Sequence, residues 1–98
     1  MLICSLERLQ NLIAQEYNEP DFLTSRKRSE ARNIYIYFSI AILNKPFKEV
    51  SQTIPFYTCS KTIYQSFRRQ YEKRKSIDTV VMVNRLKILI NGGKTSDI

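Results

Sequence analysis

Residues 46–75 read PFKEVSQTIPFYTCSKTIYQSFRRQYEKRK, and this stretch decides the fold that we expect for the chain. Phe47, Val50 and Ile54 recur at helical spacing, which predicts a first short helix. A break follows at residues 55–57, where a proline and two aromatic residues interrupt the pattern. The stretch therefore predicts two helices that meet across a short turn.

The second of these helices is expected over residues 58–74. Its apolar line repeats every four residues and consists of Cys59, Ile63, Phe67 and Tyr71. The opposite side is polar and basic, with Lys61, Gln65, Arg68 and Arg69. Two short helices joined by a tight turn, the second with a basic face, are typical of a helix-turn-helix. The sequence predicts a protein that binds double-stranded DNA, with this helix in the major groove.

The distribution of charge supports a polyanionic partner. The chain has 98 residues, 16 Lys and Arg against 9 Asp and Glu, and a net charge of +7. Residues 1–21 contain one basic and four acidic residues, whereas residues 22–75 contain twelve basic and three acidic residues. The positive charge therefore lies in the middle of the chain. A general role in solubility would explain the net charge of the chain. A concentration of basic residues in one part of the chain is instead the electrostatic pattern of a nucleic-acid-binding domain.

The rest of the chain predicts further helices and no hairpin. Helices are expected over residues 2–17, 29–44 and 78–90, with a single turn at 22–24. We therefore predict an all-α fold, a small helical bundle of five helices plus a short turn that contains the helix-turn-helix. Residues 1–93 are expected to form one domain, and residues 94–98 a disordered tail.

Residues 29–44 allow two interpretations. The segment Ile34-Tyr35-Ile36-Tyr37-Phe38 is rich in β-branched and aromatic residues and favours a strand on propensity. Sixteen residues exceed a usual strand, and apolar residues on every side suit a helix at the centre of a bundle. We predict a helix capped by Ser29, with Tyr35 and Tyr37 in the core and their hydroxyls reaching the surface.

Smaller features complete the prediction. Asp21 is expected to cap the turn at 22–24, whose two apolar residues plug the side of the domain. Either Ser76 or Asp78 is expected to cap the last helix. The residues of that helix expected to point inward are Val81, Val83, Leu86, Leu89 and Ile90.

Several classes of function lack candidate residues. The chain has no histidine, and Cys4 and Cys59 have no metal-ligand spacing, so we expect no metal, no disulfide and a reducing compartment. There is no phosphate-binding glycine loop and no pair of carboxylates in an apolar setting, so we expect no cofactor, no small-molecule substrate and no enzyme. The N-terminus does not look like a signal peptide, and no apolar run spans a membrane, which predicts a cytoplasmic protein.

The order of these features resembles a known family. The stretches YNEPDFL (17–23), ARNIYIYF (31–38) and FKEVS (47–51) are similar to motifs of the C-terminal DNA-binding domain of the bacterial replication initiator DnaA, a member of the Trp-repressor-like helix-turn-helix group. The resemblance covers residues 9–90. It departs at residues 55–62, PFYTCSKT, where the family has Gly-Gly-Arg-Asp-His-Thr-Thr-Val.

The resemblance implies specific roles for some residues. The residues that would read nucleotide bases are Thr58, Cys59, Ser60 and Lys61. One basic side chain of the loop 26–28 would enter the minor groove or contact the adjacent DNA backbone. Arg32 would hold phosphate. Because the base-reading residues differ, the family's target sequence is not expected. A role in replication initiation or transcription regulation follows from the resemblance, in a bacterial or mobile-element setting.

The full set of predicted DNA-binding residues combines both arguments. It consists of Arg26, Lys27, Arg28, Arg32, Lys48, Tyr57, Thr58, Cys59, Ser60, Lys61, Gln65, Arg68 and Arg69. Two other functions stay open on the sequence. Tyr57, Tyr64 and the basic loop suit an RNA-binding module that stacks single-stranded bases. The acidic first helix and the basic middle suit a protein-interaction adaptor, or a homodimer; the oligomeric state is not predicted.

Overall fold

The computed structural model describes residues 4–24, 29–55 and 60–92, and within these ranges the fold is helical and contains no strand. The helices are α1 (Leu6–Tyr17), α2 (Glu30–Tyr37), the π-helical segment η1 (Phe38–Ile42), α3 (Phe47–Ser51), α4 (Ser60–Glu72) and α5 (Ile77–Ile90). The predicted all-α bundle of five helices is confirmed. The predicted tail, residues 94–98, lies outside the described residues.

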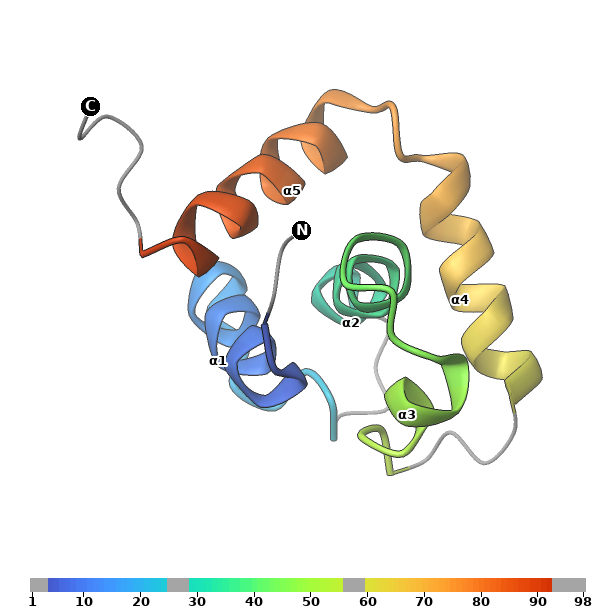
Figure 1. Ribbon diagram of the computed structural model, residues 1–98. Coiled ribbons are helices and arrows are strands. Elements are labelled where there is room, and N and C mark those ends of the chain that lie inside the picture. Colours follow the sequence, from blue (N-terminus) through green and yellow to red (C-terminus); the bar gives the residue numbers. More distant parts are fainter. Residues whose placement is uncertain (1–3, 25–28, 56–59, 93–98) are drawn as a thin grey trace.

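Helix α2 lies at the centre and the other helices surround it (Figure 1). Its buried side chains point in every direction around the helix axis: Ala31, Ile34, Tyr35, Ile36 and Tyr37. A helix can be apolar all round only if neighbours cover every side. The prediction of a central helix, rather than a strand, for this segment is confirmed.

Serine side chains begin three of the helices. Ser5, Ser29 and Ser76 each accept a hydrogen bond from the backbone N–H three residues later, at 3.2, 3.2 and 3.3 Å respectively. Each hydroxyl satisfies one of the N–H groups that a helix start leaves without a partner. The predicted cap at Ser29 is confirmed, and of the two candidates for α5 the cap is Ser76.

The π-helical segment that continues α2 was not predicted. The Ser39 hydroxyl is fully buried and donates to the Tyr35 carbonyl at 2.7 Å, which competes with the regular backbone ladder. The Leu43 N–H then reaches back to Phe38 O at 3.0 Å, and the Lys45 N–H reaches Ser39 O at 2.9 Å. Asn44 ends the segment with a left-handed φ of 58°, a conformation that asparagine tolerates.

Helix α3 is shorter than predicted. It ends at Ser51, and Thr53 and Ile54 follow in tighter turns, with N–H bonds of 3.1 Å to Val50 O and Ser51 O. The described part of α4 begins at Ser60. Ile54 is buried as expected. Most of the predicted turn, residues 56–59, lies outside the described residues.

Phe22 fills the side of the domain, as predicted for the turn at 22–24. Its side chain is 2% exposed and meets the Tyr35 ring edge-on, with 5.7 Å between ring centroids. The turn is held by the Asp21 carbonyl, which accepts from both the N–H and the hydroxyl of Thr24 at 3.0 and 3.2 Å. The backbone of Asp21 therefore makes the contacts that hold this turn.

Two predictions about single side chains are wrong. Val81 was expected to point inward but is 58% exposed, because Leu86 sets the buried side of α5 and Val81 lies about 140° around the helix from it. The Tyr35 hydroxyl was expected at the surface, yet it contacts Thr53 Oγ1 at 2.6 Å and accepts from Gln10 Nε2 at 3.1 Å.

These contacts form a hydrogen-bond chain across three elements. The Thr53 hydroxyl donates its one proton to Val50 O at 2.6 Å, so the Tyr35 hydroxyl is the donor to Thr53 and Gln10 is the donor to Tyr35. Burial raises the pKa of Tyr35, which keeps the phenol in its donating form. The chain ties α1 and the turn after α3 to the central helix.

Replacing Tyr35 by Phe tests the hydrogen bonds that link Gln10, Tyr35 and Thr53. We expect Tyr35→Phe to lower the free energy of unfolding by about 1–3 kcal/mol, because Gln10 and Thr53 each lose a partner in a partly buried setting. Denaturant unfolding measures the loss. Tyr64→Phe is the matched control, since Tyr64 is 50% exposed and its change is expected within about 0.5 kcal/mol. Equal stability of the two variants would contradict a stabilising role for these hydrogen bonds.

Candidate nucleic-acid interface

Packing against α2 and α3 fixes the orientation of α4. Ile63 is fully buried, and Ser66 is 8% exposed on the same side. Phe67 stacks on Tyr37 with centroids 5.9 Å apart and meets Phe47 edge-on at 5.6 Å. These contacts set which side of α4 faces the bundle. The predicted apolar line is correct for Ile63 and Phe67, whereas Tyr71 at its end is 43% exposed.

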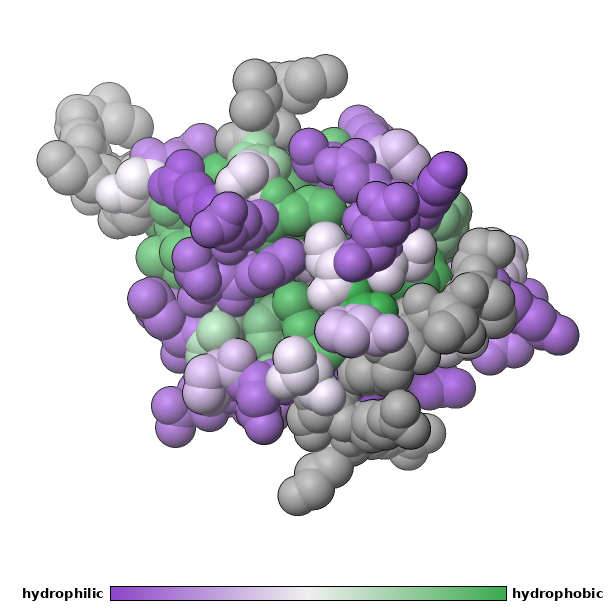
Figure 2. Space-filling view, turned by 90° about the horizontal axis from the view of Figure 1, so that it is seen from below, coloured by the Kyte–Doolittle hydropathy of each residue, from purple (hydrophilic) through white to green (hydrophobic). Residues whose placement is uncertain are grey.

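The outward side of α4 is polar. Lys61, Gln65, Arg68 and Arg69 are all exposed, as predicted. In Figure 1 the helix forms one edge of the molecule, and in Figure 2 hydrophilic side chains lie on that side and on other sides of the face shown. The structure thus brings together these four predicted residues on one helix. Lys48 is exposed on the neighbouring α3, which packs against α4.

One carboxylate interrupts the positive charge of this surface. Glu72 Oε1 lies 3.5 Å from Arg68 Nε, one helical turn away, and both side chains are 67% exposed. An exposed pair of this kind contributes about 0.2–1 kcal/mol and is screened by salt. Arg68 can therefore exchange its partner for a phosphate at small cost.

Two tyrosines lie among these polar residues. Tyr64 is 50% exposed and Tyr71 is 43% exposed. The Arg74 guanidinium lies over the Tyr71 ring at 3.9 Å from its centroid, and Arg74 Nη1 donates to Tyr71 O at 2.9 Å. One side of the Tyr71 ring is thus already covered by a cation–π contact.

The structure corrects the prediction for Arg32. This side chain is only 6% exposed, and its Nη1 donates to Phe22 O at 3.3 Å. A phosphate contact requires a guanidinium at the surface, whereas Arg32 fastens the turn at Phe22 to α2. Its role is to stabilise the fold.

The remaining predicted residues are not placed. Arg26, Lys27, Arg28, Tyr57, Thr58 and Cys59 lie outside the described residues. Ser60 is the first residue of α4, and only its backbone is described. The geometry of the interface therefore comes from Lys48, Lys61, Gln65, Arg68 and Arg69.

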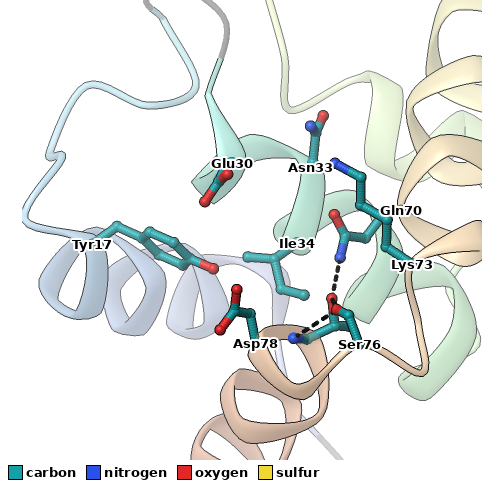
Figure 3. Close-up of a pocket in the computed structure, with 9 residues that line it drawn as sticks. Tyr17, Glu30, Asn33, Ile34, Gln70, Lys73, Ser76 and Asp78 are labelled. Atoms are coloured by element: carbon teal, nitrogen blue, oxygen red, sulfur yellow. Dashed lines mark hydrogen bonds between the residues drawn. The ribbon is translucent and has the colours of Figure 1, made fainter.

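A pocket that the sequence did not predict lies where four helix ends meet. It has a volume of about 230 Å³ and is lined by Tyr17, Glu30, Asn33, Ile34, Gln70, Lys73, Ser76, Asp78 and Thr79. In Figure 3 the Tyr17 hydroxyl and the carboxylates of Glu30 and Asp78 face one space. Gln70 Nε2 donates to Thr79 Oγ1 at 2.8 Å, which joins α4 to α5. Because the lining comes from separate parts of the chain, no spacing in the sequence indicates it.

The pocket changes the acidity of Tyr17. Burial, and then the carboxylates of Glu30, Glu19 and Asp78, raise its pKa from 10.0 to about 12. Among the described residues there is no group of three or more acidic, cysteine or histidine side chains placed to hold a metal ion. The pocket therefore offers hydrogen-bonding groups of both charges around a phenol that stays protonated.

Comparison with known proteins gives no match, whether to a family model, to a curated protein or to a solved structure. Within the ranges that the structure describes, none of the helices combines the length and the apolar character needed to cross a membrane. The site is therefore interpreted from its own geometry.

Titration of the tyrosines tests the description of the pocket. The folded chain holds the Tyr17 proton more tightly than the unfolded chain between pH 10.0 and about 12. Tyr17 therefore leaves stability unchanged below that window and lowers it as pH rises through it. We expect Tyr17→Phe to remove one phenol that titrates near pH 12 in tyrosinate absorbance, and to make the alkaline loss of stability shallower.

Glu30→Gln serves as the comparison for this titration. Removing that carboxylate is expected to lower the pKa of Tyr17, because its negative charge opposes ionisation of the phenol. If Tyr17→Phe removed only a phenol with an ordinary pKa, the pocket environment described above would be wrong.

Proposed function

We propose that the chain is a double-stranded DNA-binding module that presents the outward side of α4 to the major groove. The observation that carries this proposal is the set of exposed side chains Lys61, Gln65, Arg68 and Arg69 on one helix whose other side is packed into the bundle. An α-helix fits the major groove of B-form DNA, and packing on two other helices holds α4 in a fixed orientation. The net charge of +7 favours a polyanionic partner.

The chemistry of these side chains suggests how each would act. Lys61 at the start of α4 suits guanine O6 or N7, and Gln65 one turn later suits adenine N6 and N7. Arg68 and Arg69 lie further along the helix and suit the sugar-phosphate backbone. The resemblance to the DNA-binding domain of DnaA supports the same arrangement and adds the loop 26–28 as a second contact. It also supports a role in replication initiation or transcription regulation.

A second candidate is binding of single-stranded nucleic acid, which the 50% exposure of Tyr64 favours, because bases stack on exposed aromatic rings. The other exposed tyrosine of α4 is less suited, since Arg74 already covers one side of the Tyr71 ring. A competition assay between duplex DNA and single-stranded RNA separates the two candidates. Stronger binding of the single strand would replace the duplex proposal.

Duplex binding and its salt dependence test the proposal directly. With about five phosphate contacts, the logarithm of the association constant is expected to fall with the logarithm of salt concentration at a slope near −4 to −5. Arg69→Ala is expected to weaken binding to all duplexes and to make this slope shallower by about 1. Fluorescence anisotropy with labelled duplexes measures both quantities.

Arg8→Ala is the charge-matched control for Arg69→Ala. Arg8 is an exposed arginine of α1, on the side of the molecule away from α4 (Figure 1), so its loss is expected to leave the slope nearly unchanged. Equal effects of the two substitutions would show attraction by net charge alone. Selection of bound duplexes from a random pool then tests specificity: absence of an enriched sequence would contradict base reading by Lys61 and Gln65.

Removing the carboxylate of Glu72 is expected to strengthen binding. Glu72→Gln frees Arg68 from its exposed ion pair and removes a negative charge from the outward side of α4. The pair contributes about 0.2–1 kcal/mol, so affinity is expected to rise roughly 1.4- to 5-fold at low salt. Glu7→Gln, at an exposed position of α1 away from α4, is the comparison for the same loss of charge elsewhere. Unchanged or weaker binding by the Glu72 variant would place the duplex on another surface.

A further inference from the structure

The pocket that contains Tyr17 is lined by two kinds of polar side chain. Gln70, Ser76 and Thr79 bond to one another, with Gln70 Nε2 at 2.8 Å and Ser76 Oγ at 2.9 Å from Thr79 Oγ1. The other polar side chains of the lining form no hydrogen bond or ion pair with any residue that the structure describes: Tyr17, Glu30, Asn33, Lys73 and Asp78. Their hydrogen-bonding groups are therefore free to contact a bound molecule.

These five side chains are separated by charge. In Figure 3 the Tyr17 hydroxyl and the carboxylates of Glu30 and Asp78 lie to the left of Ile34. The Lys73 ammonium and the Asn33 amide lie to the right of Ile34 in the same view. An apolar side chain thus lies between an acidic group and a group of N–H donors that all line one pocket.

The acidic side of the pocket favours positive charge. Burial, and then the carboxylates of Glu30, Glu19 and Asp78, raise the pKa of Tyr17 to about 12, so the field of these carboxylates opposes a second negative charge there. An ammonium group in the same place would gain from that field, and the phenol oxygen can accept its hydrogen bond. On the other side, Lys73 and Asn33 can donate to a carboxylate.

We propose that this pocket binds a small molecule with an ammonium group at one end, a carboxylate at the other and a short apolar chain between them. The ammonium would lie among Tyr17, Glu30 and Asp78, the carboxylate would accept from Lys73 and Asn33, and the chain would cover Ile34. A ligand with only a positive charge would leave Lys73 without a partner, and one with only a negative charge would be repelled by the two carboxylates.

The volume of the pocket limits the size of the ligand. An apolar cavity of about 150 Å³ holds one benzene molecule. A pocket of about 230 Å³ therefore suits a ligand of about eight or nine non-hydrogen atoms, the size of 5-aminopentanoate or 6-aminohexanoate. Because the charged side chains of the lining are exposed, we expect a dissociation constant on the order of 1 mM.

Titration of the ¹⁵N-labelled chain with 5-aminopentanoate, followed by NMR, tests the proposal. Saturable shifts of the backbone amides are expected around residues 17, 30–34 and 70–79. Pentylamine lacks the carboxylate and pentanoate lacks the ammonium, and each is expected to bind about two- to fivefold more weakly. No saturable shifts, or equal binding of pentylamine and 5-aminopentanoate, would overturn the proposal. The protein is titrated without DNA, so this proposal and the DNA-binding proposal can fail separately.

Nα-Acetyl-lysine distinguishes two sources of this ligand chemistry. It presents the ammonium and carboxylate of a C-terminal lysine, whereas 5-aminopentanoate represents a free ω-amino acid. Tighter binding of Nα-acetyl-lysine would assign the pocket to the end of a peptide, and tighter binding of 5-aminopentanoate would assign it to a free small molecule.

Two substitutions locate the ammonium group. Asp78→Asn is expected to weaken binding of 5-aminopentanoate about two- to fivefold, and Tyr17→Phe is expected to weaken it without changing any charge at a helix end. Glu49→Gln is the matched control, because α3 packs at the start of α4 whereas the pocket takes the end of α4. Circular dichroism verifies that each variant folds. Equal dissociation constants for Asp78→Asn and Glu49→Gln would overturn the proposal.

Discussion

The burial of α2, from which only Glu30 is exposed, is the constraint on which the rest of the structure depends. A helix with apolar side chains all round cannot remain in water, so a neighbour has to cover each of its sides. Its few polar groups are used to hold those neighbours. The Ser29 hydroxyl donates to Glu19 at 2.9 Å, Arg32 donates to Phe22 O, and the Tyr35 hydroxyl joins the chain from Gln10 to Thr53. The polar groups of α2 thus decide where the segments around it are fastened.

The exposed polar surface of α4 follows from the same constraint. Because Ile63 and Phe67 pack toward the centre, the opposite side of α4 has to face water, and its polar residues are brought into one row. Packing with Tyr37 and Phe47 holds that row in a fixed orientation. A helix that is already fixed loses less conformational entropy when a ligand binds to it. The fixed orientation of α4 is therefore a consequence of core packing.

Sequence periodicity predicted most of the fold because burial on one side imposes a helical repeat that is visible without coordinates. Prediction from periodicity failed where the position of a side chain depends on a group that is distant in the sequence. Arg32 is buried because a carbonyl at Phe22 accepts its hydrogen bond, and the short α3 reflects hydroxyls that compete for helix carbonyls. The pocket at Tyr17 needs four helix ends to meet. On α4, by contrast, the exposed basic residues were predictable, because a single amphipathic repeat places all of them.

The size of the domain explains why its outer surfaces differ. One central helix with a single layer around it, of radius of gyration 13.0 Å, gives every outer helix one side toward the core and one toward water. Small domains have too little interior to bury both sides. Helix α4 meets this condition with charged and polar residues, and α1 does so with Glu7, Arg8 and Asn11. Helix α5 keeps apolar residues on both sides, so the core alone does not account for its sequence, and the outward residues require a separate physical explanation.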